Sequence, residues 1–266
     1  MTTLEAVTLD FGNTLVPVDR AGLQAVVDAT ARHVVERCGL PDRDAFLGAW
    51  AEERERQFRE DVPALREVDL AQRTARVLAR LRGMRPPAVT QRWDDEAAAA
   101  LSSPGEVEMA VEAYSAAFVD GMPVPPAVEP LLARLVRRGL RLAVLSNWPL
   151  AATIDRYCDA AGWTPHLVAI VISQRVGVVK PHPAIFEAAR SALGSPNPAA
   201  ILHVGDDWSA DVVGARAAGW RTAHVRGRPD DSPLPGSEPD GTIHADFELR
   251  ALAELEFVID RVLSRS

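Results

Sequence analysis

The apolar pattern of this chain changes twice along its length, and these changes limit the folds it can adopt. Residues 4–9 form an apolar-rich strand that ends at Asp10. From Arg20 to about Ala117 the apolar residues recur with helical spacing, and Pro, Gly and Asp residues separate several helices. After the proline-rich run 121–126, strands and helices alternate. This alternation predicts an α/β fold with a doubly wound, Rossmann-like parallel sheet.

The same pattern gives approximate bounds for the expected elements. Strands are expected after the helical block at 141–145, 167–173, 201–204 and 222–225. Helices are expected at 21–38, 44–59, 68–81, 91–101, 128–138, 150–161, 183–193, 209–218 and 247–263. The stretch 227–241 is rich in Pro, Gly and Asp, and we expect a surface loop without function there.

The helical block is too long to be a simple connection. It separates the first strand from the others by about a hundred residues, whereas connections within compact domains are short. We therefore expect two domains: an α/β core of residues 1–17 and 121–266, and a small all-helical cap of residues 18–120.

Composition excludes several classes of protein. The net charge of −8 argues against a partner that is nucleic acid or an anionic membrane. Two cysteines are too few for a disulfide framework, and neither a signal peptide nor a membrane-spanning run is visible. We expect a cytoplasmic protein. The sequence does not distinguish a monomer from a homodimer.

Polar side chains follow the predicted strands, at the edge of the sheet where ligands bind in such folds. Asp10 follows the first strand, and Asp206 and Asp211 follow the strand at 201–204. Carboxylate oxygens suit Mg²⁺. Ser146 and Asn147 end another strand and offer a hydroxyl and an amide to an anion. Together with a lysine, these groups indicate a phosphoryl-transfer site in which Asp10 is a covalent nucleophile.

That lysine is Lys180, the only lysine among 29 basic residues. A compact ammonium differs in shape and hydration from the guanidinium that is used everywhere else in the chain. Retention of lysine here indicates a site where arginine cannot substitute.

These segments resemble the four motifs of the haloacid dehalogenase superfamily, in order and over nearly the whole chain. The matching segments are Asp10-Phe11-Gly12-Asn13-Thr14, the strand that ends in Ser146-Asn147, Lys180-Pro181, and Gly205-Asp206 with the downstream Asp211. The helical insertion resembles the small cap of that superfamily.

The resemblance implies a role for each matching residue. Asp10 is implied as the nucleophile, and Asp10, Asp206, Asp211 and the carbonyl of Gly12 as the groups that hold Mg²⁺. The residues implied to hold the phosphate, with Lys180 also neutralising Asp10, are Thr14, Ser146, Asn147 and Lys180.

The main departure from the family pattern is Gly12. Phosphatases of the superfamily carry an aspartate there, which serves as general acid and then as base; glycine keeps the carbonyl but supplies no proton. The superfamily's haloacid dehalogenases also lack this acid, but they carry small polar residues where this chain has Gly205-Asp206. Asp19 could supply the missing proton, although a helix cap is the favoured interpretation. Asp207 could contact the metal, but for this residue too a helix cap is favoured. His203 is expected to be structural.

The sequence thus predicts a Mg²⁺-dependent phosphohydrolase of a small phosphorylated metabolite, acting through an aspartyl-phosphate on Asp10. Two alternatives remain open. One is a metal-free 2-haloacid dehalogenase. The other is a weakened relative that binds a phosphorylated ligand or a protein partner without turnover, which the absence of an acid at Gly12 would favour.

Overall fold

A parallel β-sheet organises the larger part of the chain. The computed structural model describes residues 3–40, 42–239 and 241–264, and within them six strands pair in the order β3-β2-β1-β4-β5-β6. The strands are β1 (Ala6–Leu9), β2 (Arg141–Ser146), β3 (Ala169–Ile172), β4 (Ile201–Gly205), β5 (Arg221–Val225) and β6 (Phe247–Leu249). Every pair is parallel, and the central strand β1 lies between β2 and β4. The predicted fold class is confirmed.

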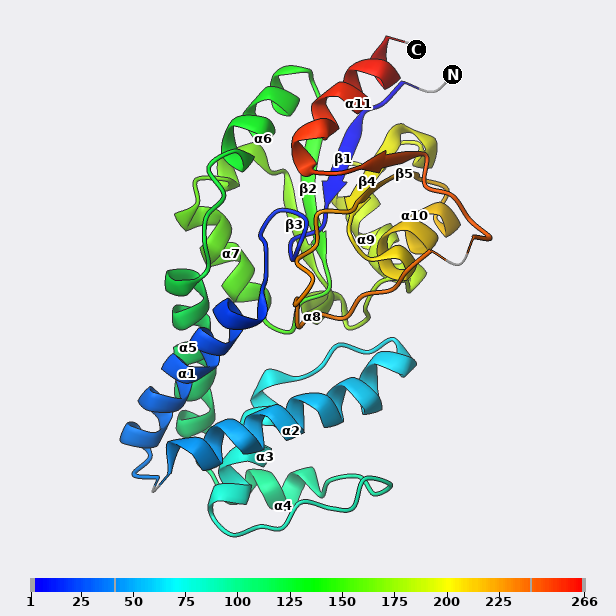
Figure 1. Cartoon of the computed structure of the whole chain (residues 1–266). Coiled ribbons are helices and arrows are strands. Elements are labelled where there is room, and N and C mark those ends of the chain that lie inside the picture. Colours follow the sequence, from blue (N-terminus) through cyan, green and yellow to red (C-terminus); the bar gives the residue numbers. More distant parts are fainter. Residues whose placement is uncertain (1–2, 41, 240, 265–266) are drawn as a thin grey trace. The chain divides into compact units, whose positions relative to one another are not determined.

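Helices cover both faces of this sheet, so the central strands are buried on both sides. Figure 1 shows α6 and α7 on one face and α9 and α10 on the other. The bounds are α6 (Val128–Arg137), α7 (Ala151–Ala160), α8 (Ser173–Val176), α9 (Pro183–Ala192), α10 (Gly214–Ala217) and α11 (Leu255–Leu263). On the α9 side, Phe186 and Trp220 pack edge to face over Leu145 and other buried side chains of the sheet.

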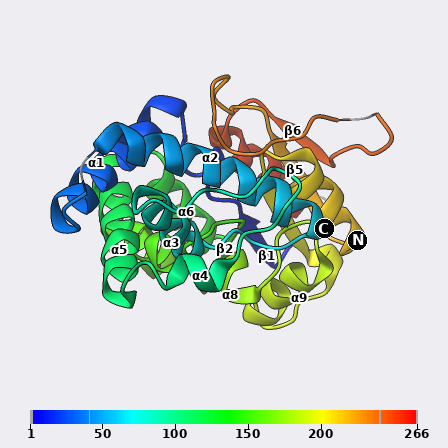
Figure 2. The same cartoon turned by 90° about the horizontal axis from the view of Figure 1, so that it is seen from below.

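The chain divides into two compact units, Met1–Arg20 with Met122–Ser266, and Ala21–Gly121. The second unit is helical (Figure 2), and its function as a cap stays a prediction. Its helices are α1 (Arg20–Arg37), α2 (Arg43–Asp61), α3 (Leu70–Leu81), α4 (Asp95–Ala99) and α5 (Pro104–Gly121). Phe46 stacks on Trp50 and Trp50 on Tyr114 inside it. No helix in the described part of the chain is long and apolar enough to cross a membrane.

Three expected elements differ from the structure. The final helix begins at Leu255 and not near Phe247, because residues 247–249 add strand β6 to the edge of the sheet. The helix expected at 91–101 is only the short α4. The helix expected at 209–218 begins as a π-helical turn, Trp208–Val213, that continues into α10.

Candidate active site

Three acidic side chains meet at the carboxyl ends of β1 and β4. Asp10 follows β1, Asp206 follows β4, and Asp211 lies in the π-helical turn after β4. One carboxylate oxygen from each lies within 4.8 Å of the others, and all three residues are buried. Buried carboxylates at this separation repel one another unless cations lie between them.

The ammonium group of Lys180 joins two of these carboxylates. Its Nζ donates hydrogen bonds to Asp10 Oδ1 at 2.8 Å, to Asp211 Oδ1 at 2.6 Å and to the carbonyl oxygen of Leu145 at 2.8 Å. All three ammonium protons are therefore used. A planar guanidinium cannot direct three donors from one atom in this way, which gives a structural reason for the single lysine.

The charge states of Lys180 and Asp211 are set by the groups around them. Burial alone would lower the pKa of Lys180, but Asp10 and Asp211 more than offset it and raise that pKa above its usual value. Burial would likewise raise the pKa of Asp211, but Lys180 and a hydrogen bond from His203 outweigh it and lower that pKa. Lys180 and Asp211 thus form a charged pair at neutral pH.

The negative charges of the Asp10 and Asp206 carboxylates are less fully balanced by nearby positive charges. Burial raises the pKa of Asp10, with Lys180 opposing the shift. Burial, together with repulsion from Asp10 and Asp211, raises the pKa of Asp206 to about 8. Arg228, 3.4 Å from Asp206, opposes this shift without cancelling it, so the site favours a further cation beside Asp206.

Asp211 is held by a chain of buried groups. His203 Nε2 lies 2.9 Å from Asp211 Oδ1, and Thr8 Oγ1 lies 2.8 Å from the other ring nitrogen. Burial lowers the pKa of His203, so the ring is neutral. A Cβ on Gly205 would lie 2.2 Å from Asp211 Cγ, so only glycine fits there. The expected structural role of His203 agrees with these contacts.

The predicted phosphate-binding residues lie around the acidic cluster. The hydroxyl of Ser146 hydrogen-bonds to Asp10. Thr14 Oγ1 donates to Asp206 Oδ1 at 3.4 Å. The side-chain amide of Asn147 bonds to the backbone of Lys180, accepting from its N–H at 2.7 Å and donating to its carbonyl at 3.0 Å. Asn147 thus positions the lysine, and its predicted phosphate contact stays a prediction, as do those of Thr14, Ser146 and Lys180.

Gly12 is not open on the side where a side chain would project. A Cβ on Gly12 would lie 2.6 Å from Leu234 Cδ1 and 3.5 Å from Trp148 Cζ3. The backbone of Gly12 is outside the left-handed region, so it can accept an L side chain if Leu234 moves. The volume of the missing acid is thus filled by an apolar side chain from the loop after β5.

That loop, expected to be a surface loop without function, contacts the site at several points. Arg228 Nη1 lies 3.4 Å from Asp206 Oδ2. Ser237 Oγ donates to Asp207 Oδ1 at 2.8 Å, while Asp207 also accepts from the N–H of Ala210 as the predicted helix cap. Arg228 and Leu234 were not identifiable from sequence, because a Pro/Gly-rich stretch has no periodicity that reveals which side chains point inward.

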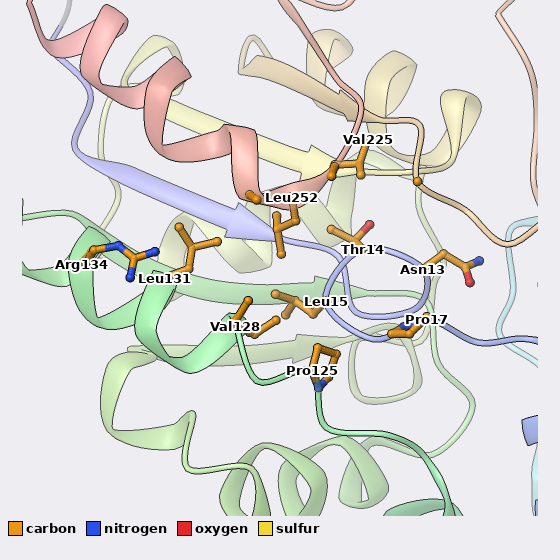
Figure 3. Close-up of a pocket in the computed structure, with 14 residues that line it drawn as sticks. Asn13, Thr14, Leu15, Pro17, Pro125, Val128, Leu131, Arg134, Val225 and Leu252 are labelled. Carbon is orange, nitrogen blue, oxygen red and sulfur yellow. The ribbon is translucent and has the colours of Figure 1, made fainter.

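A separate cavity of about 290 Å³ lies beside the loop after β1 (Figure 3). Its walls are mostly apolar, with Leu15, Val128 and Leu252 among them, and Arg134 lies at one end. It adjoins Thr14, but none of the three clustered carboxylates lines it. The chemistry described above is therefore outside this cavity.

Comparison with known proteins places these features in a family. The family model for haloacid dehalogenase-like hydrolases matches residues 4–219. A phosphoserine phosphatase of Thermus thermophilus is 41% identical over 121 residues, which are 44% of this chain and 46% of that protein. The pyrimidine 5′-nucleotidase YjjG of Escherichia coli is 31% identical over 145 residues, 51% of this chain and 61% of that protein. The chain thus matches only about half the length of these relatives.

Solved structures show the same fold over nearly the whole chain. The crystal structure of a 2-haloacid dehalogenase from Pseudomonas syringae superposes with a TM-score of 0.68 at 23% sequence identity, covering 97% of this chain and 99% of that one. At this identity the similarity concerns the fold, and the fold alone does not separate a phosphatase from a dehalogenase.

Proposed function

Since the chain belongs to the haloacid dehalogenase-like hydrolase family, we propose that it is a Mg²⁺-dependent phosphohydrolase of a small phosphorylated metabolite, with Asp10 as the nucleophile. The observation that carries this proposal is the setting of Asp10. Its carboxylate is held by Lys180 and Ser146, beside Asp211, which Lys180 also contacts, and Asp206, which Lys180 does not contact. The phosphatases among the relatives support the reaction class.

The acidic cluster fits a hard divalent cation. Asp206 carries the least compensated carboxylate, and all the donors are oxygens, as Mg²⁺ prefers. Asp10, Asp206 and the carbonyl of Gly12 would hold the ion directly. Both oxygens of Asp211 already accept hydrogen bonds, from Lys180 and His203 on one and from the N–H of Asp207 on the other, which suits a role toward the ion's waters. When bound, the ion would offset the negative charge shared by the phosphate and the carboxylates.

The residues of the chain can perform two displacements at phosphorus. A carboxylate oxygen of Asp10 attacks phosphorus, and the bond to the leaving-group oxygen breaks with its electron pair. Water then attacks phosphorus in the aspartyl-phosphate, which restores the Asp10 carboxylate and yields inorganic phosphate. Lys180 and Ser146 hold Asp10 throughout. Gly12 offers no proton, so the leaving group departs as an anion.

A metal-free dehalogenase is the competing function, and it uses the same nucleophile. The cluster of Asp10, Asp206 and Asp211 favours the phosphohydrolase, because a metal-free reaction has no use for three buried carboxylates that repel one another. A weakened relative that binds a phosphorylated ligand or a protein partner without turnover is the third candidate, which Gly12 favours, and detection of turnover would exclude it.

Chelation should therefore abolish hydrolysis of phosphate esters, and added Mg²⁺ should restore it. Release of inorganic phosphate from p-nitrophenyl phosphate with EDTA, then with excess MgCl₂, measures this directly. Halide release from 2-chloropropionate under the same conditions is the matched assay. Halide release at full rate in EDTA, with no phosphatase activity, would establish the dehalogenase instead.

The missing acid predicts a preference for good leaving groups. Aryl and acyl phosphates, whose leaving groups depart as stable anions, should react faster than alkyl phosphates. Gly12→Asp alone must displace Leu234, so the double variant Gly12→Asp/Leu234→Ala should show the larger gain, about 10-fold or more on alkyl phosphates. Leu234→Ala alone is the control for the space that is created. Equal wild-type rates on alkyl and aryl esters would show that another side chain supplies the proton.

A further inference from the structure

The segment after β5 contacts the two loops that carry the acidic cluster at four points. Residues 226–239, called the post-β5 segment here, contain neither helix nor strand and run as the orange loop between β5 and β6 in Figure 2. The four pairs are Arg228 with Asp206, Ser232 with Asn13, Leu234 with Gly12, and Ser237 with Asp207. Every pair ends on a residue of the loop after β1 or of the turn after β4. A loop that only connects two strands has no reason to concentrate its contacts there.

Arg228 contacts both the backbone of the post-β5 segment and the carboxylate of Asp206. Its Nη1 donates to the carbonyl of Pro235 at 2.8 Å and lies 3.4 Å from Asp206 Oδ2. Its Nη2 donates to the carbonyl of Leu234. One guanidinium thus fixes the turn that carries Leu234 and the carboxylate of Asp206 at the same time. Because the carbonyls of Leu234 and Pro235 are bonded to this guanidinium, a shift of Arg228 away from Asp206 would also shift the turn that places Leu234 over Gly12.

Asp206 has no unused oxygen. Thr14 Oγ1 lies 3.4 Å from its Oδ1 and Arg228 Nη1 lies 3.4 Å from its Oδ2, and the side chain is 5% exposed. A divalent cation on Asp206 needs one of these oxygens and repels the guanidinium. Arg228 and the metal therefore compete for Asp206.

We propose that Arg228 is a positioning residue that occupies Asp206 in the metal-free protein, and that metal loading releases Arg228 and with it the post-β5 segment. This inference rests on the metal site of the proposed function. Its consequence is that Leu234 leaves Gly12 when the site is loaded, so that the side of the site next to Gly12 opens only in the metal-bound protein. The metal ligand, the segment and the space beside the nucleophile are thereby coupled.

Direct measurement of metal binding tests this without any substrate. Titration calorimetry with MgCl₂ should show that Arg228→Gln binds about 10-fold more tightly than the wild type, a gain of about 1.4 kcal/mol. Arg226→Gln is the matched control, because Arg226 lies in the same segment, is 63% exposed and pairs with Glu248. It should bind like the wild type. Equal or weaker binding by Arg228→Gln would overturn the competition.

Hydrogen exchange of the post-β5 segment provides the second measurement. Saturating Mg²⁺ should speed exchange of its amides in the wild type, whereas Arg228→Gln should exchange fast with or without the ion. Arg228→Lys keeps the charge but loses the fork that holds the carbonyls of Leu234 and Pro235. Arg228→Lys should bind Mg²⁺ with nearly wild-type affinity, and the amides of its post-β5 segment should exchange faster than those of the wild type. Wild-type exchange that does not respond to Mg²⁺ would overturn the release.

Failure of this inference can be told apart from failure of the proposed function. A wild type that binds no Mg²⁺ overturns the metal dependence and the role of Arg228 together. A wild type that binds Mg²⁺, loses binding in Asp206→Asn and is unaffected by Arg228→Gln overturns only the role of Arg228.

Discussion

Replacement of Asp10 with asparagine is expected to abolish turnover, by roughly 10³-fold or more, while the protein stays folded. The amide is isosteric with the carboxylate but has no anionic oxygen to attack phosphorus. Lys180 keeps its bonds to Asp211 and to the carbonyl of Leu145, so the ammonium remains anchored. Steady-state phosphate release and circular dichroism on the purified variant measure the two effects.

Asp207→Asn is the matched control for this change. Asp207 lies beside Asp206, but its carboxylate caps the turn after β4 through the N–H of Ala210, and an asparagine caps a helix equally well. Its turnover should stay within a few-fold of wild type. If Asp10→Asn keeps more than a few percent of activity, the nucleophile is another group.

Replacement of Lys180 with arginine is expected to give the second largest loss, about 10²-fold in turnover. The charge is kept, but the flat guanidinium cannot reach Asp10, Asp211 and the carbonyl of Leu145 from one atom. The site is enclosed, with the Lys180 side chain 2% exposed, so the larger group should also cost about 1–3 kcal/mol of unfolding free energy.

Thermal unfolding and kcat measured side by side separate these two effects. The control is Arg190→Lys, the reverse exchange at an exposed pair with Glu187, which should change neither quantity noticeably. Wild-type turnover in Lys180→Arg would mean that charge alone suffices and that the geometry of the ammonium has no role.

The fold is predictable from the amino-acid sequence because the central strands are buried on both faces. The strands β1, β2 and β4 are rich in apolar residues and almost entirely buried, with Thr8 and His203 as polar exceptions in the strand interiors, and helices with a helical apolar period separate most of the strands. Strand β6 has only three residues and follows an irregular loop, so no period distinguished it from the start of a helix. Its pairing with β5 depends on contacts between segments distant in the sequence, which a local pattern does not reveal.

The site was predictable only in part, for a related reason. Carboxyl ends of neighbouring parallel strands meet at one edge, and this brings Asp10 and Asp206 together whatever the loops do. The need for glycine at position 205 appears only when Asp211 is placed against it. Arg228 and Leu234 come from a segment without periodicity, so their positions depend on contacts that no local pattern encodes.

The central claim is that phosphorus is transferred to Asp10, and rapid-quench mass spectrometry tests it most directly. The protein would be mixed with Mg²⁺ and an excess of acetyl phosphate, quenched in acid during the first turnover, and digested. We expect a phosphoryl group on the peptide that carries Asp10, and none on that peptide in Asp10→Asn. Turnover of the phosphate substrate with that peptide unmodified at every quench time would contradict the account.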